Sequence, residues 1–155
     1  MELETAIALD QNNALAIRQM GSTLLAQGKP EAAIPYYEKA IRLDPRALDV
    51  FRAYVNLASC HLYLHRPDEA IGSYRRARAL APGVWYVHLN LAGALGLRGD
   101  IDEAKIEIAE MAKLKPELNS IARLRAFQGR FGPRYWALLD KTTWAGLRRA
   151  GFPEE

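Results

Sequence analysis

The sequence predicts an all-α protein in which helix–turn–helix units stack into a superhelix. Two observations carry this prediction: a regular punctuation of the chain, and apolar residues at helical spacing within each interval. Apolar runs end in Leu plus one residue before Gln11, Pro45, Pro82 and Pro116, which lie 34, 37 and 34 residues apart. A period of this size is typical of stacked copies of one supersecondary unit. Such a stack offers a long groove rather than a deep catalytic pocket.

Residues 1–13 match only the second half of a unit, with Ala6 in the place of Ala40. A half-unit leaves an apolar face uncovered, and the terminal units of a stack normally need caps. We therefore expect this chain to be the C-terminal piece of a longer protein, with Met1 introduced at its start. The alternative is a native short chain whose first helix caps the stack.

Complete units are predicted at residues 14–50, 51–84 and 85–116, with their first helices starting at Ala14, Phe51 and Trp85. Apolar residues recur in register at steps of three and four, the spacing of one helical face. Small residues recur where two helices must approach closely. The aligned sets include Met20, Leu57 and Leu91; Gly21, Ala58 and Ala92; Ala33, Ala70 and Ala104; and Tyr37, Tyr74 and Ile108.

A tight turn is predicted between the two helices of each unit. Gly28 and Gly99, which align with His65, suit a left-handed residue just past a helix end. Pro30 and Pro67 suit the first turn of the next helix, where a missing N–H costs nothing. Acidic residues then lie at the positive end of that helix: Glu31, Asp68, Glu69, Asp102 and Glu103. Three extra residues between Pro45 and Phe51 are expected to extend the following helix by about one turn.

Residues 117–155 are predicted to form capping helices, one over 117–127 and an amphipathic one over 133–149. Gly151 and Pro153 end the second. Two interpretations remain open: the last helix caps the third unit, or it docks into the groove or onto a partner. We favour the cap because solenoid ends need one.

The repeated pattern resembles the tetratricopeptide repeat (TPR) family over about residues 1–116. Gln11 replaces the closing proline, and the usual aromatic fourth position holds Ile17, Tyr54 and His88. The resemblance implies a right-handed superhelix in which the first helix of each unit lines a concave groove that binds proteins.

A second resemblance concerns residues 147–154, Leu-Arg-Arg-Ala-Gly-Phe-Pro-Glu, which are similar to the "LRKAGLPE" ending of many bacterial proteins. Those proteins join a class III adenylate/guanylate cyclase domain, or a DNA-binding domain, to TPR repeats. The resemblance implies a regulatory C-terminal region of a multidomain bacterial protein. Nothing in the sequence resembles the cyclase domain itself.

The charge and composition of the chain restrict the partners and the cellular compartment that we expect for it. The net charge of +3 comes from the tail, because residues 1–116 hold 14 Lys/Arg and 14 Asp/Glu. The tail arginines are Arg123, Arg125, Arg130, Arg134, Arg148 and Arg149. Cations spread in this way are a weak signal of nucleic-acid binding, and we favour the interpretation that they lie on solvated helix faces.

No apolar run approaches the ~20 residues that cross a bilayer. The start is unlike a secretion signal and Cys60 is the single cysteine, so we expect a reducing cytoplasm.

No cluster of titratable residues suggests catalysis, so neither an enzyme nor a cofactor is predicted. The best metal candidate is Cys60 with His61 and His65, but His61 aligns with Leu24 and Leu95. A packing role for His61 is favoured, since a fourth ligand is lacking. Cys60 is expected to be a buried small hydrophobe.

The groove is the better candidate site. Gln19, Asn56 and Asn90 share the sixth position of the first helices and would form a ladder of amides that grip a peptide backbone. Arg18 could pair with an acidic group, and Trp85 and Tyr86 could add aromatic anchors, whereas Tyr54 is expected in the core. The alternative is that the amides are solvated or bond to neighbouring helices.

The TPR family also contains chaperone-binding domains with a carboxylate clamp. Arg18 and Asn56 match that clamp loosely, but Ser22, Tyr86 and Asn90 depart from the Asn, Lys and Arg/Lys that it requires. The resemblance therefore does not favour binding of a chaperone tail.

The leading hypothesis is a non-catalytic scaffold that binds a protein or peptide segment through Arg18, Gln19, Ser22, Asn56, Tyr86 and Asn90. The alternatives are a nucleic-acid accessory domain acting through the tail arginines, and a homodimer formed through residues 2–10.

Overall fold

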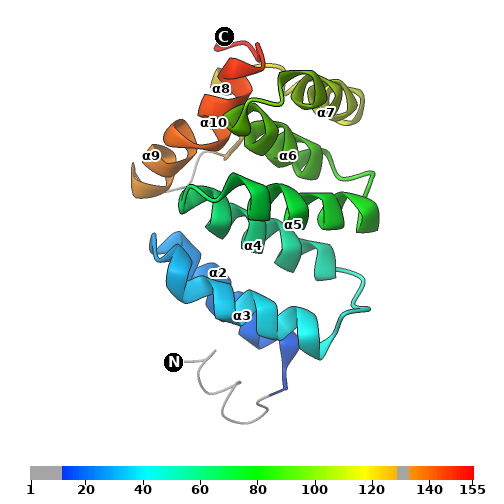
Figure 1. The fold of residues 1–155 in the computed structure, drawn as a ribbon, viewed down its shortest axis with the longest axis vertical. Helices are drawn as coiled ribbons and strands as arrows, with labels where there is room; N and C mark the ends of the chain where they lie inside the picture. The colour runs from blue at the N-terminus through cyan, green and yellow to red at the C-terminus, as the bar shows by residue number, and fades with distance from the viewer. Residues whose placement is uncertain (1–11, 129–132) are drawn as a thin grey trace.

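The computed structural model describes residues 12–128 and 133–155. These residues form three helix pairs followed by three shorter helices, with no strand among them (Figure 1). The pairs are α2 (Ala14–Ala26) with α3 (Pro30–Leu43), α4 (Val50–Tyr63) with α5 (Pro67–Leu80), and α6 (Trp85–Arg98) with α7 (Ile101–Leu114). The shorter helices are α8 (Ile121–Gln128), α9 (Pro133–Lys141) and α10 (Thr143–Arg149). The predicted all-α stack of helix–turn–helix units is confirmed. The half-unit at the N-terminus, with the dimer surface at residues 2–10, lies outside the described residues.

The turns between paired helices have the predicted geometry. Gly28 and Gly99 adopt φ angles of 73° and 106°, and His65, at the aligned position, adopts 58°. After Gly28, the N–H of Lys29 donates to the carbonyl of Leu24, which closes the helix end. Each turn therefore reverses the chain within a few residues and sets the two helices antiparallel.

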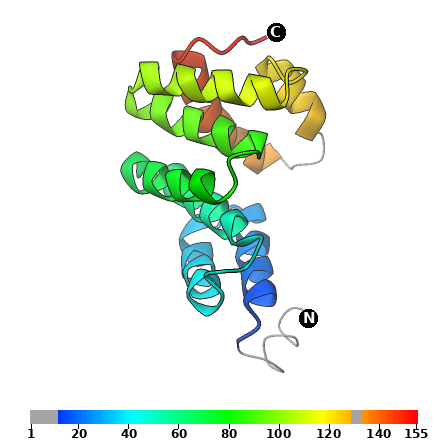
Figure 2. The ribbon, with the colours of Figure 1, turned by 90° about the vertical axis from the view of Figure 1, so that its right-hand side faces the viewer.

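The pairs stack because each helix buries its small, aligned residues. The two helices of a pair pack on each other, and the second helix of each pair packs on the first helix of the next. Ala33, Ala70 and Ala104 are fully buried at these contacts. Figure 2 shows the successive pairs turned relative to one another, so the stack twists.

Two partly buried hydroxyl pairs repeat with the units. Tyr37 donates to Oγ of Ser22 at 3.3 Å, and Tyr74 lies 2.9 Å from Oγ of Ser59. The third unit has Gly93 and Ile108 at these positions, so it carries no such pair. Because Gly93 has no side chain, another backbone has room to approach α6 at this position.

His88, which departs from the family's usual aromatic, is buried and fully bonded. Its Nδ1 lies 2.7 Å from Oε2 of Glu107 and its Nε2 lies 2.8 Å from the carbonyl oxygen of Pro82. Glu107 also accepts a hydrogen bond from Arg78. A polar bridge thus replaces apolar packing between α6 and α7.

The predicted extension of the helix after Pro45 is wrong. Helix α4 has 14 residues, as α5 does, and begins only one residue before Phe51. The extra residues form a looped connection in which the N–H of Ala47 bonds to Asp44 and that of Val50 bonds to Ala47. These local turns satisfy the backbone, and Leu48 lies fully exposed in the loop.

The single helix predicted over 133–149 is also wrong, since it is two helices. Thr142 interrupts it with φ −126° and ψ −96°, and its hydroxyl donates to the carbonyl of Leu138 at 2.6 Å. The break lets α9 and α10 follow different directions. The helix predicted over 117–127 begins at Ile121, where Oγ of Ser120 accepts from the N–H of Arg123.

Candidate functional site

Helix α10 lies against α6, the first helix of the third unit. The two backbones nearly touch at Gly93 and Gly96 of α6 and Gly146 of α10. A Cβ atom added to Gly146 would overlap the carbonyl oxygen of Gly93, and one added to Gly93 would lie 2.6 Å from Cγ2 of Thr143. In the first two units the second helix of a pair packs on the next first helix, so α10 occupies a different place from that of a further repeat. It packs instead on α6, the first helix of the third pair.

Helix α9 precedes α10 and lies near the ends of the helices in the first two units. Together, α9 and α10 form a wall along one side of the stack. The ring of Tyr135 packs edge-on against Tyr63 at the end of α4, with centroids 6.3 Å apart. Burial raises the pKa of the Tyr135 hydroxyl above its ordinary value. Arg134 and Leu138 border the same shallow pocket as Gly28, in the turn between α2 and α3. The C-terminal helices therefore cover the C-terminal ends of the first helices.

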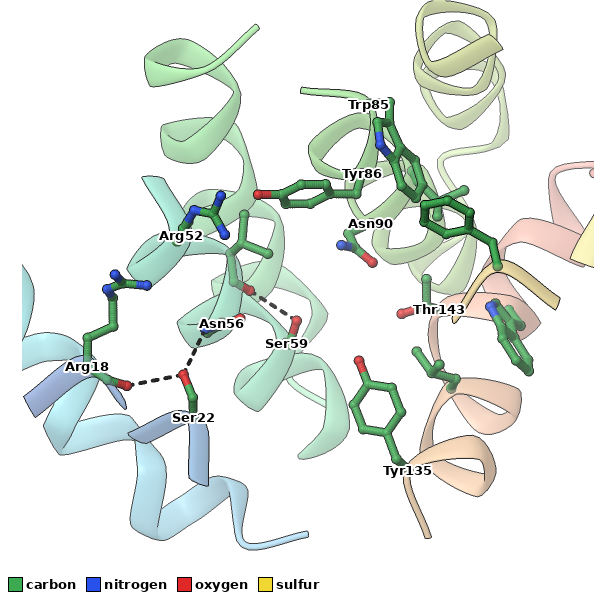
Figure 3. A pocket seen from close by; sticks show the side chains of 15 residues that line it. Arg18, Ser22, Arg52, Asn56, Ser59, Trp85, Tyr86, Asn90, Tyr135 and Thr143 are labelled. Carbon is green, nitrogen blue, oxygen red and sulfur yellow. Dashed lines mark hydrogen bonds between the residues drawn. The ribbon is translucent and has the colours of Figure 1, made fainter. Parts of the chain in front are cut away.

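The part of the first helices that remains open forms a cavity of about 430 Å³ between α2, α4 and α6 on one side and α8, α9 and α10 on the other (Figure 3). We call this space the groove cavity. It is lined by Arg18, Ser22, Arg52, Val55, Asn56, Ser59, Trp85, Tyr86, Leu89, Asn90, Phe127, Tyr135, Leu139, Thr143 and Trp144. The lining combines two cations, several amide and hydroxyl groups, and five aromatic rings.

Five of the six residues proposed from the sequence meet in this cavity: Arg18, Ser22, Asn56, Tyr86 and Asn90. Gln19 is exposed and does not line it. The structure therefore brings together two of the three amides of the expected ladder. Their role in binding a peptide stays a prediction.

The polar groups at the α2–α4 end of the cavity already bond to one another. Asn56 donates from Nδ2 to Oγ of Ser22 at 3.4 Å, and Ser22 donates to the carbonyl of Arg18 at 3.1 Å. Arg18 forms an ion pair with Asp49. In contrast, the amide of Asn90 has no hydrogen-bond partner among the described residues, and Figure 3 shows it pointing into the cavity. Asn90 thus differs from Asn56, whose amide bonds to Ser22.

Aromatic rings form the other end. Trp85 and Tyr86 lie at the start of α6, as the sequence suggested, while Tyr54 packs partly buried against the core. Phe127 meets Trp85 edge-on with ring centroids 5.7 Å apart. Trp144 stacks on Trp136 with centroids 5.3 Å apart. Sequence reasoning missed Phe127, Tyr135 and Trp144 as site residues, because it treated the tail only as a cap or a docking helix.

Cys60 and its neighbours behave as packing residues. Cys60 is fully buried, and burial raises the pKa of its thiol to about 12. Burial lowers the pKa of His61, whose Nδ1 is buried and has no hydrogen-bond partner in the described part of the chain. Within residues 12–128 and 133–155, no three His, Cys, Asp or Glu side chains gather as a metal site.

Most tail arginines that the structure describes are engaged within the protein. Arg125 and Arg148 both pair with Asp140, and Arg148 also pairs with Glu154. Arg149 donates to the carbonyl of Leu97 at 2.7 Å. These contacts tie the tail together and offer no support for a nucleic-acid surface. Across the described helices, none has the length and apolar character that a membrane span requires.

Comparison with known families identifies the class of this protein. Two models described as tetratricopeptide repeat match overlapping stretches, residues 11–83 and 55–118. Together they cover more than half of the chain and all three helix pairs. The chain belongs to the tetratricopeptide repeat family, whose fold is typically a non-catalytic scaffold for protein interactions.

Among curated proteins, the chain is similar to the tetratricopeptide repeat and J domain-containing co-chaperone DNJ1 of two fungi. The protein of Cryptococcus neoformans is 29% identical over 105 residues, which are 68% of this chain and 20% of the relative. That of Fusarium oxysporum is 34% identical over 86 residues, 55% of this chain and 16% of the relative. The chain thus spans about a fifth or less of the length of these relatives.

Solved structures share the fold. MamA superposes with a TM-score of 0.69 at 22% identity, covering 96% of this chain and 82% of MamA. PilF of Pseudomonas aeruginosa gives 0.69 at 21%, covering 96% of this chain and 65% of PilF. The first TPR domain of Spaghetti (RPAP3), bound to the HSP90 peptide SRMEEVD, gives 0.65 at 23%, covering 83% and 95%.

Proposed function

We propose that this protein is a non-catalytic interaction module that holds a segment of another protein in the groove cavity. One observation carries the proposal: Arg18, Ser22, Asn56, Tyr86 and Asn90, chosen from their places in the repeats, line one open cavity. Amides beside aromatic rings can bond to a peptide backbone and cover its side chains. A structural neighbour, the first TPR domain of Spaghetti, is bound to a peptide, which supports this kind of partner.

The test compares variants inside and outside the cavity. Asn90→Ala removes an amide that bonds to no described residue, so folding should be unaffected while capture of a partner peptide falls. Loss of one or two peptide hydrogen bonds should weaken binding by about 1 kcal/mol, roughly fivefold. Gln19→Ala, exposed and outside the cavity, is the matched control. Peptides selected without bias on the purified chain provide the probe, and calorimetry gives the affinities. Equal loss in both variants, or in neither, would contradict the proposal.

The biological setting is a further part of the proposal. The ending at residues 147–154 supports a regulatory C-terminal region of a larger bacterial protein, with a nucleotide cyclase domain before the repeats, acting in the cytoplasm. Sequencing the parent gene upstream of Met1 tests this: a reading frame without such a domain would contradict it and leave the interaction role untouched.

A further inference from the structure

We propose that the C-terminal helices are one wall of the binding site, and that the site takes an extended segment with a large apolar side chain close to an acidic one. This inference rests on the proposed function and adds the chemistry of the partner. It assigns the apolar side chain to the end near α8 and α10 and the acidic side chain to the end near Arg52.

The apolar end is built by residues from three helices. Phe127 of α8 is 58% exposed and meets Trp85 of α6 edge-on, while Trp144 and Leu139 line the same cavity. A large ring left half in water gains free energy when another apolar group covers it. An aromatic or long aliphatic side chain that packs on Phe127 beside Trp85 would cover this exposed apolar surface.

The charged end carries a cation without a carboxylate partner. Arg18 and Arg52 line the cavity, and none of the lining residues is acidic. Asp49 neutralises Arg18. Arg52 is exposed, lies over the ring of Phe51 at 5.6 Å, and pairs with no carboxylate among the described residues. A carboxylate on the bound segment would complement this charge.

The packing of α10 on α6 favours a wall that stays in place over a segment that a partner displaces. Gly146 of α10 lies so close to Gly93 and Gly96 that the two helices interlock. The end of the chain is tied down as well, because the N–H groups of Ile121 and Ala122 donate to the carbonyls of Pro153 and Glu154, each at 2.9 Å. The cavity is therefore open to a separate chain while α10 stays in place.

The experiment selects random dodecapeptides on the intact protein by display and measures the enriched sequences as synthetic peptides. We expect enrichment of an aromatic or long aliphatic residue within a few positions of Asp or Glu. Phe127→Ala should weaken binding by about tenfold or more, as loss of an aromatic anchor does. Arg52→Gln should weaken it by about threefold and flatten its salt dependence.

Matched controls lie on α5, away from the cavity. Leu80→Ala and Arg76→Gln remove an exposed apolar side chain and an exposed cation, and should change affinity by less than about twofold. Circular dichroism checks that each variant is folded. Peptides that lose affinity with Asn90→Ala but lack the apolar–acidic pattern, or that bind Phe127→Ala normally, would overturn this inference and leave the proposed function standing. No enrichment of any peptide would overturn both.

Discussion

His61 departs from the repeat pattern, and this departure affects the stability of the fold and its pH dependence. It takes a position that the other units fill with Leu24 and Leu95, and its Nδ1 is buried without a partner in the described residues. Burial lowers its pKa, because the charged imidazolium loses water there. The unfolded chain therefore binds protons more readily than the folded one, and stability falls as the pH drops below about 6.5.

We expect His61→Leu to stabilise the protein by roughly 1 kcal/mol near neutral pH, since it removes an unsatisfied buried polar atom. The gain should grow as the pH falls from about 6.5 toward 5, because the variant no longer has this proton linkage. Urea unfolding at several pH values measures both effects. A gain that shrank at low pH would contradict the assignment.

His65 is a second residue-scale departure, in backbone conformation. It holds a left-handed φ of 58° where the other units have Gly28 and Gly99. A side chain in that region costs roughly 1–2 kcal/mol, part of which glycine returns through its greater freedom in the unfolded chain. His65→Gly should therefore raise stability by about 1 kcal/mol. The imidazole of His65 is exposed, so little packing is lost in this variant, and urea unfolding measures the change in stability. A destabilised His65→Gly would show that the turn is not strained.

At the scale of elements, the close crossing of α6 and α10 decides where the tail goes. Three glycines make it possible, and one of them, Gly93, takes the position that Ser22 and Ser59 hold in the other two units. The crossing aims Thr143 and Trp144 at the groove cavity. The position of α10 thus depends on three residues without side chains, which let the two backbones come close together.

Gly146→Ala should destabilise the protein by about 2 kcal/mol or more, because the added methyl group overlaps the α6 backbone. Gly72→Ala is the control: Gly72 lies within α5, and a Cβ there meets nothing within 4 Å. Removing a glycine from a helix should stabilise that variant by about 0.5–1 kcal/mol. Thermal unfolding distinguishes the two, and equal midpoints would contradict the packing described for α10.

The sequence predicted the paired helices closely, because the pattern of each helix occurs in three aligned copies. Agreement between the copies makes the assignment of each helix more secure. It mispredicted features that occur only once, among them two breaks in helical structure. The connection before Val50 has no copy to show that Asp44 and Ala47 close local turns. The break at Thr142 depends on α9 and α10 reaching different partners, which a local apolar pattern does not encode.

The same distinction holds for the whole molecule and its site. The first helices of a repeat stack share one open side, and for this reason the repeat pattern predicts together five residues that line one cavity in the structure: Arg18, Ser22, Asn56, Tyr86 and Asn90. Gln19 falls outside because it lies on the exposed side of α2. Phe127, Tyr135 and Trp144 enter through non-repeating contacts of the tail, which depend on the glycine crossing. The repeat pattern predicts an open groove, and the structure shows a cavity whose second side is formed by α8, α9 and α10.

The most direct test of the account is a nuclear magnetic resonance titration of the isotope-labelled protein with its best peptide ligand. We predict shifts of the side-chain amide signals of Asn56 and Asn90 and of the indole signals of Trp85 and Trp144, with the signals of α5 and α7 unchanged. Shifts confined to α5 and α7, with the cavity signals unmoved, would contradict the claim that this protein binds its partners in the groove cavity.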